Sequence, residues 1–186
     1  MKKIENMKNK LSAEKYIRTK AGSLPFGECY VNETWKEKGM AVVFVSRIMP
    51  SGKFIIGVYN VDIFCLGLKD TLYRFALDDF ERREFLKRVL DGFGNILPLE
   101  PNQAHNIIYG AVDYAEELGF KPHKDFKLTE YLLDPDLIDD GIDEIEFGMN
   151  GKPHYISGPF DNAGKILEIL NRTAGEGNYY YTIAEH

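Results

Sequence analysis

The densest group of side chains that could do chemistry lies within residues 62–70, which read DIFCLGLKD. Two carboxylates, Asp62 and Asp70, bracket the thiol of Cys65 and the ammonium group of Lys69. A lysine beside carboxylates can orient an anionic substrate, and a cysteine becomes a nucleophile where a neighbouring base lowers its pKa. We therefore treat these four residues as candidate catalytic groups. The competing interpretation is structural, with Lys69 and Asp70 forming a surface ion pair and Asp70 capping a turn.

A second group lies on and after the longest predicted helix. His105, Tyr109 and Asp113 are spaced four residues apart, so they share one edge of that helix and are candidate ligand-binding residues. His123 and Asp125 follow the helix and complete the catalytic candidates, because histidine and carboxylate can supply acid and base. His105 and His123 sit at opposite helix ends, roughly 20 Å or more apart, so they cannot share one metal. In the alternative interpretation Tyr109 packs and His123 braces the loop.

The acidic stretch at 134–146 raises the question of a metal site. A calcium loop of the EF-hand type needs oxygen ligands at positions 1, 3 and 5 and glycine at position 6, but Ile138 and Asp139 occupy positions 5 and 6. The sequence also lacks a Gly-rich phosphate loop ending in Lys and Ser/Thr, a G-x-G-x-x-G turn, a G-x-S-x-G elbow and an H-E-x-x-H helix. We therefore predict a solvated acidic loop, no metal and no cofactor.

These candidates must be positioned by a central β-hairpin, which the sequence predicts at 41–64. Its strands, 41–49 and 53–64, are rich in Val, Ile, Phe and Tyr, and a turn between them offers Gly52 for a positive φ. Residues 42–45 are all apolar, which predicts a strand buried on both faces. A third strand is expected at 71–75 after a turn at 66–70. The first candidate group therefore falls at a sheet end, where polar side chains can converge on a rigid scaffold.

Helices and shorter elements complete the predicted fold. Pro101 and Gly119 bound the best-defined helix, and Asp78 with Glu81 predicts a capped helix at 79–92 whose charged face is solvated. Further expected elements are a helix at 3–18, a helical turn or strand at 127–133, a hairpin pairing 142–147 with 153–157, a helix starting at Asp161 and an edge strand at 179–183.

The predicted fold class is α+β, with a mainly antiparallel sheet built on the hairpin 41–64 and three or four helices packed against it. Residues 1–20 are expected to form a basic helical arm, and residues 21–186 a single α+β domain. With 44% hydrophobic and 13% aromatic residues, the composition is that of a globular protein.

Charge and cysteine content exclude some classes of protein. The net charge of −6 makes nucleic-acid binding over the whole surface unfavourable, although the basic arm permits a local contact. Cys29 and Cys65 match no metal or redox spacing, which predicts two buried thiols in a reducing compartment. No segment approaches the roughly 20 apolar residues of a membrane-spanning helix, so we expect a cytoplasmic protein that does not enter a membrane.

Three segments resemble signature blocks of a family of bacterial proteins that has no established activity. They read GVYNVDIFCLGLKDTLYRF, AHNIIYGAVDYAEELGFKPHKDF and, at residues 146–155, a hairpin of the EFGxNGKPHY type. The resemblance covers about residues 24–156 and implies no catalytic residue. It marks these block positions: Asp62, Cys65, Gly67, Lys69, Asp70, Tyr109, Gly110, His123 and Asp125.

Three functional hypotheses remain. The first is a non-catalytic domain that binds a small ligand or a partner, which could be another protein or a second copy of the chain. The second is a hydrolase acting on a phosphorylated or nucleic-acid substrate through Asp62, Asp70, His123 and Asp125. The third is RNA contact through the basic arm. Convergence of the candidate residues in one pocket would favour an enzyme or a specific ligand site.

Overall fold

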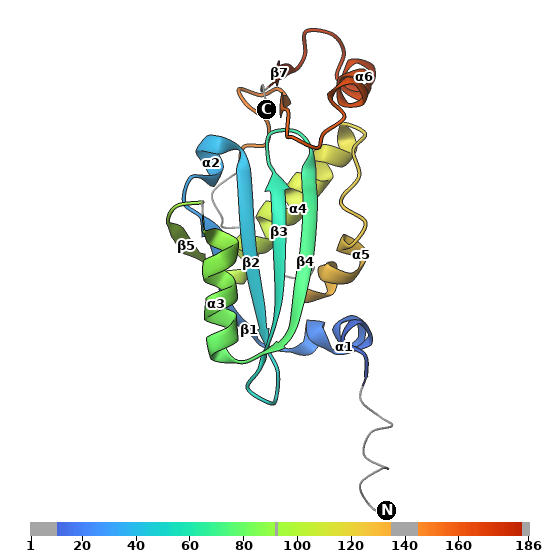
Figure 1. Ribbon diagram of the computed structural model, residues 1–186. Coiled ribbons are helices and arrows are strands. Elements are labelled where there is room, and N and C mark those ends of the chain that lie inside the picture. The colour runs from blue at the N-terminus through green and yellow to red at the C-terminus, as the bar shows by residue number, and fades with distance from the viewer. Residues whose placement is uncertain (1–10, 92, 135–144, 184–186) are drawn as a thin grey trace, which may run out of the picture.

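A five-stranded antiparallel sheet forms the centre of the fold, with strand order β4-β3-β2-β1-β5 (Figure 1). The computed structural model describes residues 11–91, 93–134 and 145–183. The strands are β1 Phe26–Asn32, β2 Met40–Ile48, β3 Phe54–Asp62, β4 Gly67–Leu77 and β5 Ile96–Leu99. The predicted α+β class with an antiparallel sheet is confirmed.

The β2–β3 hairpin has the predicted form. Its strands pair in continuous register, and Gly52 in the turn has a φ of 76°. Val42 and Phe44 are buried on one face of the sheet, while Val43 and Val45 are buried on the other. The loss of alternation in the sequence therefore reflects a strand covered on both faces.

Helices cover the two faces of the sheet. Helix α4 (Pro101–Glu117) packs on one face, and α3 (Asp79–Leu90) packs on the other (Figure 1). The helices α1 (Ala13–Lys20) and α5 (Phe126–Thr129) pack on the same face as α4, near β4. With α2 (Trp35–Lys38) and α6 (Ala163–Thr173), the described residues form six α-helices rather than three or four. The single turn α2 was not predicted, whereas α5 corresponds to the helical alternative for 127–133.

The C-terminal residues form a small lobe at one end of the sheet. It contains α6 and a separate parallel pair, β6 (His154–Ile156) and β7 (Tyr180–Thr182). Main-chain hydrogen bonds from His154 N–H to Phe64 C=O (3.0 Å) and from Gly148 N–H to Ile63 C=O (2.9 Å) attach the lobe to the β3–β4 turn. The lobe is therefore joined to the sheet end that carries the first candidate group.

Several sequence predictions differ from the structure. Residues 145–147 form no strand, and only an isolated bridge around the turn at Asn150 remains of the expected second hairpin, because β6 pairs with β7 instead. The short strand β5 was missed, since Pro98 argues against a strand except at a sheet edge. Residues 142–144, which belong to that hairpin, lie outside the described residues, as do most of the acidic stretch and residues 1–10.

The charged face of α3 is also less solvated than predicted. Arg82 is buried, forms ion pairs with Glu28 and Asp79, and lies over the Phe54 ring. None of the described helices is long and apolar enough to cross a membrane.

Candidate functional site

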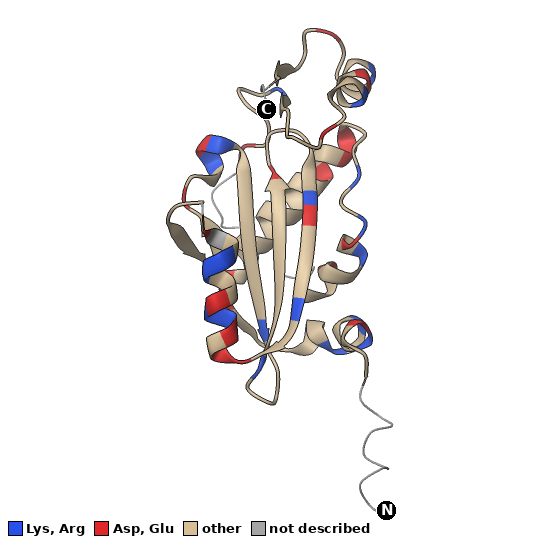
Figure 2. Cartoon of the chain, in the orientation of Figure 1, with Lys and Arg blue, Asp and Glu red and all other residues tan. Residues whose placement is uncertain are grey.

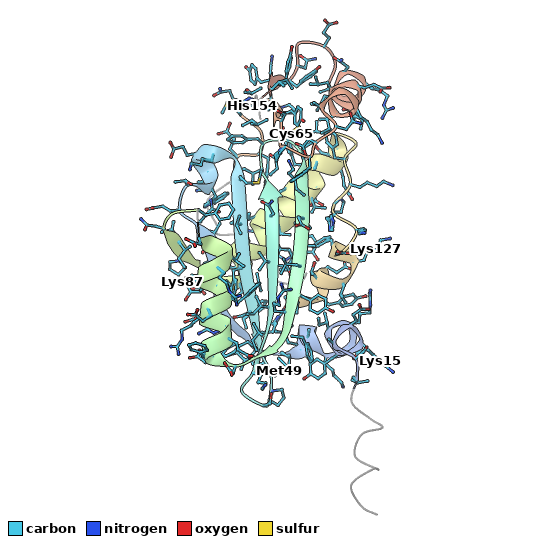
Figure 3. All side chains as sticks on the ribbon, in the orientation of Figure 1. Lys15, Met49, Cys65, Lys87, Lys127 and His154 are labelled. Carbon is cyan, nitrogen blue, oxygen red and sulfur yellow. The ribbon has the colours of Figure 1, made fainter. Side chains whose placement is uncertain are left out.

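Asp62 is the last residue of β3, Cys65 lies in the turn between β3 and β4, and both are buried. The Asp62 carboxylate accepts hydrogen bonds from the N–H groups of Phe64 (2.9 Å) and Cys65 (3.0 Å). Burial raises the pKa of this carboxyl to about 6. The Cys65 thiol lies between the sheet and the C-terminal lobe (Figure 3), and burial, with the Asp62 charge, raises its pKa. Since the reactive form of cysteine is the thiolate, this environment disfavours Cys65 as a nucleophile.

A close approach of β4 to α4 fixes this turn. Gly67 has a φ of 67°, and a Cβ there would lie 2.6 Å from the Cβ of Ala115 and 2.8 Å from the C=O of Ala111. Only glycine satisfies both the positive φ and the lack of space. The polar groups of the turn are thus held in place by backbone packing.

Lys69 does not pair with Asp70. Its Nζ lies 3.0 Å from the Asp161 carboxylate of the C-terminal lobe, which also accepts from the N–H of Gly158 at 2.8 Å. Burial opposes ionisation of Asp161, but these two donors outweigh it and bring its pKa below the ordinary value. Lys69 therefore joins the lobe to β4, and the expected surface pair with Asp70 is wrong.

Asp70, His123 and Asp125 do come together, and we call them the edge cluster. His123 Nδ1 lies 3.8 Å from Asp70 Oδ1 and 3.9 Å from Asp125 Oδ2. After α4 ends at Glu117, the chain turns at Gly119 and returns along β4, and the N–H of His123 bonds the C=O of Leu68 at 2.9 Å. The imidazole between two carboxylates could accept or transfer a proton.

The three candidates on α4, which are His105, Tyr109 and Asp113, do not join the edge cluster. His105 is buried and its ring centroid lies 4.4 Å from that of Tyr109, which packs in turn on Phe126. Burial lowers the pKa of His105 and raises that of Tyr109. Asp113 is exposed. Tyr109 therefore acts as a packing residue, and the nine candidates fall into an interior turn, a lobe contact, the edge cluster and a helix edge.

Comparison with the known protein families, with curated proteins and with solved structures finds no match. The resemblance to a bacterial family stays a prediction. Among the described residues, no group of three or more His, Cys, Asp or Glu side chains could hold a metal ion.

A pocket of about 520 Å³ adjoins the edge cluster, between β4 and the helices α1 and α5. We call it the α5-side pocket. Asp125 belongs to both the pocket and the cluster, and Thr71 on its wall donates to Val58 C=O (2.9 Å) and contacts the Thr129 hydroxyl (3.0 Å). Its lining is Glu14, Thr71, Leu72, Tyr73, Arg74, Phe75, Asp125, Leu128 and Thr129.

A second pocket of about 460 Å³ lies between β4 and α3, on the opposite face of the sheet, and we call it the α3-side pocket. Phe80 lines it with an exposed ring, and the Arg74 guanidinium lies 5.0 Å from the centre of the Phe85 ring. The full lining is Arg74, Leu77, Phe80, Glu81, Glu84, Phe85 and Arg88. Arg74 is therefore shared by the two pockets.

The strand between the pockets is the edge of the sheet. Charged side chains lie along β4 but not along the middle of β2 and β3 (Figure 2). The N–H of Thr71 donates to the Asp70 carboxylate (2.8 Å), and the C=O of Tyr73 accepts from the Arg74 guanidinium (3.0 Å). Residues two apart on a strand point their main-chain groups to the same side. Because Thr71 N–H and Tyr73 C=O bond side chains of β4 itself, that side faces away from β3.

Two irregularities bound this open stretch. The pairing of β4 with β3 shifts between Asn60 and Val61, and again between Phe54 and Ile56, near Ala76 with its φ of 59°. Sequence reasoning missed the edge and its pockets. The charges at 69, 70 and 74 were the available signal, because natural proteins place charges on edge strands.

Proposed function

We propose that the chain is a non-catalytic binding domain, whose site is the open edge of β4 and whose ligand is an extended segment of a partner protein. One observation carries the proposal: on that edge Thr71 N–H and Tyr73 C=O bond side chains of their own neighbours, and among the described residues no other strand lies beside β4 there. Exposed side chains can move aside, and an added strand can then use both groups. The proposal places the chain in the cytoplasm, where the buried free thiols of Cys29 and Cys65 would remain reduced.

The interior candidates support a binding role over chemistry. The Cys65 thiol is buried with a raised pKa, and the Asp62 carboxylate accepts main-chain hydrogen bonds in the turn. The accessible polar groups lie instead along β4, beside two pockets. Pockets beside an open edge are what strand addition uses for specificity.

A matched pair of variants at Tyr73 tests the proposal. Tyr73→Pro removes the outward N–H, which an edge strand tolerates, and Tyr73→Ala removes the same ring but keeps the N–H. Peptides are first selected on the full chain from a display library of random 12-residue sequences. We expect the selected peptides to bind the Ala variant and to lose binding to the Pro variant, provided that both variants show a cooperative thermal transition.

Two results would count against strand addition. Equal binding of the peptides to the Pro and Ala variants would show that the Tyr73 main chain is not used. A library that yields no binding peptide would argue against an extended peptide as the ligand.

A second candidate is acid–base hydrolysis at the edge cluster, which the position of His123 between two carboxylates favours. It predicts that the protein hydrolyses a phosphodiester such as bis(4-nitrophenyl) phosphate, and that His123→Gln abolishes the turnover. Absence of turnover by the unmodified chain would exclude this candidate for that substrate class. RNA contact by the basic arm involves residues 1–10, outside the described part, and stays a prediction.

A further inference from the structure

The two pockets lie on opposite faces of the sheet, and both border the same edge strand. Thr71 on the wall of the α5-side pocket bonds Thr129 of α5, whereas Arg74 in the α3-side pocket lies over Phe85 of α3. Successive side chains of an extended strand point to opposite faces. A strand added to β4 would therefore direct alternate side chains toward one pocket and then the other.

The α3-side pocket fits a large apolar side chain. Phe80, Phe85 and Leu77 contribute its apolar wall, and the Phe80 side chain is 69% exposed. The charges around it, two arginines and two glutamates, balance. An aromatic or large aliphatic group would cover exposed apolar surface there without having to match a net charge.

The α5-side pocket fits a basic side chain. Two carboxylates line it, Glu14 from α1 and Asp125 from the edge cluster, and its one basic residue is Arg74. The guanidinium of Arg74 is shared with the α3-side pocket, where it lies over the Phe85 ring, so at this pocket two carboxylates face one shared cation. The local charge is therefore negative, which favours lysine or arginine in the ligand.

We infer that the partner segment carries an apolar and a basic side chain an odd number of residues apart. This inference rests on the proposed strand addition to β4. Such spacing puts the two side chains on opposite faces of the strand. The apolar group would enter the α3-side pocket, and the basic group would reach Glu14 and Asp125. Recognition would then depend on spacing as well as on composition.

Two synthetic peptides of equal composition test this inference. Each is an eight-residue chain capped at both ends. One reads TVTFTVKV, with Phe at position 4 and Lys at position 7, and the other reads TVTFTKVV, in which the residues at positions 6 and 7 are exchanged. Amide NMR titration of the full chain measures affinity and shows whether Thr71 and Tyr73 respond. We expect the peptide with odd spacing to bind about tenfold more tightly, the effect of burying one apolar side chain.

Variants of the protein then assign the pockets. Phe80→Ala should remove the advantage of odd spacing, and the double variant Glu14→Gln with Asp125→Asn should remove the preference for Lys over Glu at position 7. All three residues are exposed, so the fold should be retained, which the unperturbed NMR spectrum of the core would show.

The outcomes separate this inference from strand addition itself. Equal affinities with both amides responding would overturn the pocket assignment and leave strand addition standing. Binding that leaves both amides unaffected, or no binding at millimolar peptide, would overturn both. If sedimentation shows that the chain self-associates and the same amides respond without peptide, the occupant is a second copy and the inference is wrong.

Discussion

Arg47 on β2 and Arg74 on β4 each place a guanidinium over a phenyl ring, yet they differ in every other contact. Arg47 is 2% exposed, lies 3.4 Å from the centre of the Phe26 ring, and donates to the carbonyls of Leu24, Leu132 and Leu133 at 2.7–2.9 Å. Arg74 is exposed and donates to the neighbouring C=O of Tyr73. One guanidinium joins three segments of the fold, and the other lies on an open edge.

The same contrast separates two sets of polar residues. Arg47, Tyr59 and Asp62, which we call the closed set, are buried and bond main-chain groups. Asp70 and Arg74, the open set, bond main-chain groups of their own edge strand and remain exposed. Residue types suited to chemistry are therefore available to a ligand only where their side chains stay exposed and bond main-chain groups of their own strand alone.

Arg47→Met should have the largest effect on stability. It leaves three buried carbonyls without a donor, so the free energy of unfolding should fall by about 3 kcal/mol or more. Arg74→Met, the matched change in the open set, should cost less than about 1 kcal/mol. Urea unfolding of both variants measures the difference. Equal losses would show that the two arginines do not differ as their contacts indicate.

Asp62 should make stability fall as the pH rises. Its folded pKa of about 6 lies above the ordinary value of 3.8, so the folded state holds this proton more tightly than the unfolded chain does. That contribution to stability is present below pH 4 and is lost as the pH rises through 6. Asp62→Asn cannot ionise, so between pH 4 and 7 the stability of the variant should improve relative to the unmodified protein by about 2 kcal/mol. Parallel pH profiles would contradict the assignment.

Tyr59→Phe should have an intermediate effect. The Tyr59 hydroxyl is buried and donates to the C=O of Thr129 at 2.8 Å, which ties α5 to the middle of the sheet. Removing the donor leaves a buried carbonyl unsatisfied, at about 1–2 kcal/mol. Thermal or urea unfolding measures the loss, and hydrogen exchange should locate it in α5. An unchanged unfolding curve would mean that the hydroxyl is not part of the closed set.

Asp70→Ala should have the smallest effect on stability. The carboxylate is exposed, and the N–H of Thr71 that it caps can bond water instead. The expected change is within about 0.5 kcal/mol, as for surface substitutions in general. The affinity for peptides that pair with β4 should change instead, because the substitution frees the N–H of Thr71 for pairing. A loss of stability comparable to that of Tyr59→Phe would place Asp70 with the closed set.

Local patterns predicted the parts of the fold that depend on neighbouring residues. The apolar run at 42–45, Gly52 in the turn, and the capping pair Asp78 and Glu81 each specify short-range geometry, and the structure confirms all three. The parallel pairing of β6 with β7 joins residues more than twenty positions apart and leaves no periodic signal in either segment.

The candidate site could not be predicted from the sequence, because it depends on contacts between distant segments. Asp70 and His123 are brought together by one long-range main-chain bond, between His123 and Leu68. No spacing in the sequence encodes that bond. Lys69, adjacent to Asp70, turns instead to Asp161 in the lobe. Sequence reasoning therefore identified suitable residue types but could not say which of them the fold would bring together.

The irregularities at the two ends of β4 limit how long a segment bound to this strand would stay. They leave roughly residues 71–74 free for pairing, and at about 1 kcal/mol per main-chain hydrogen bond so short a stretch supplies only a few kcal/mol. Affinity from main-chain pairing alone would lie near the millimolar range, and with an ordinary association rate of about 10⁶ M⁻¹s⁻¹ a segment held by pairing alone would leave in roughly a millisecond. Occupancy of the edge would then follow the local concentration of the segment, and tethering the partner nearby would raise it most.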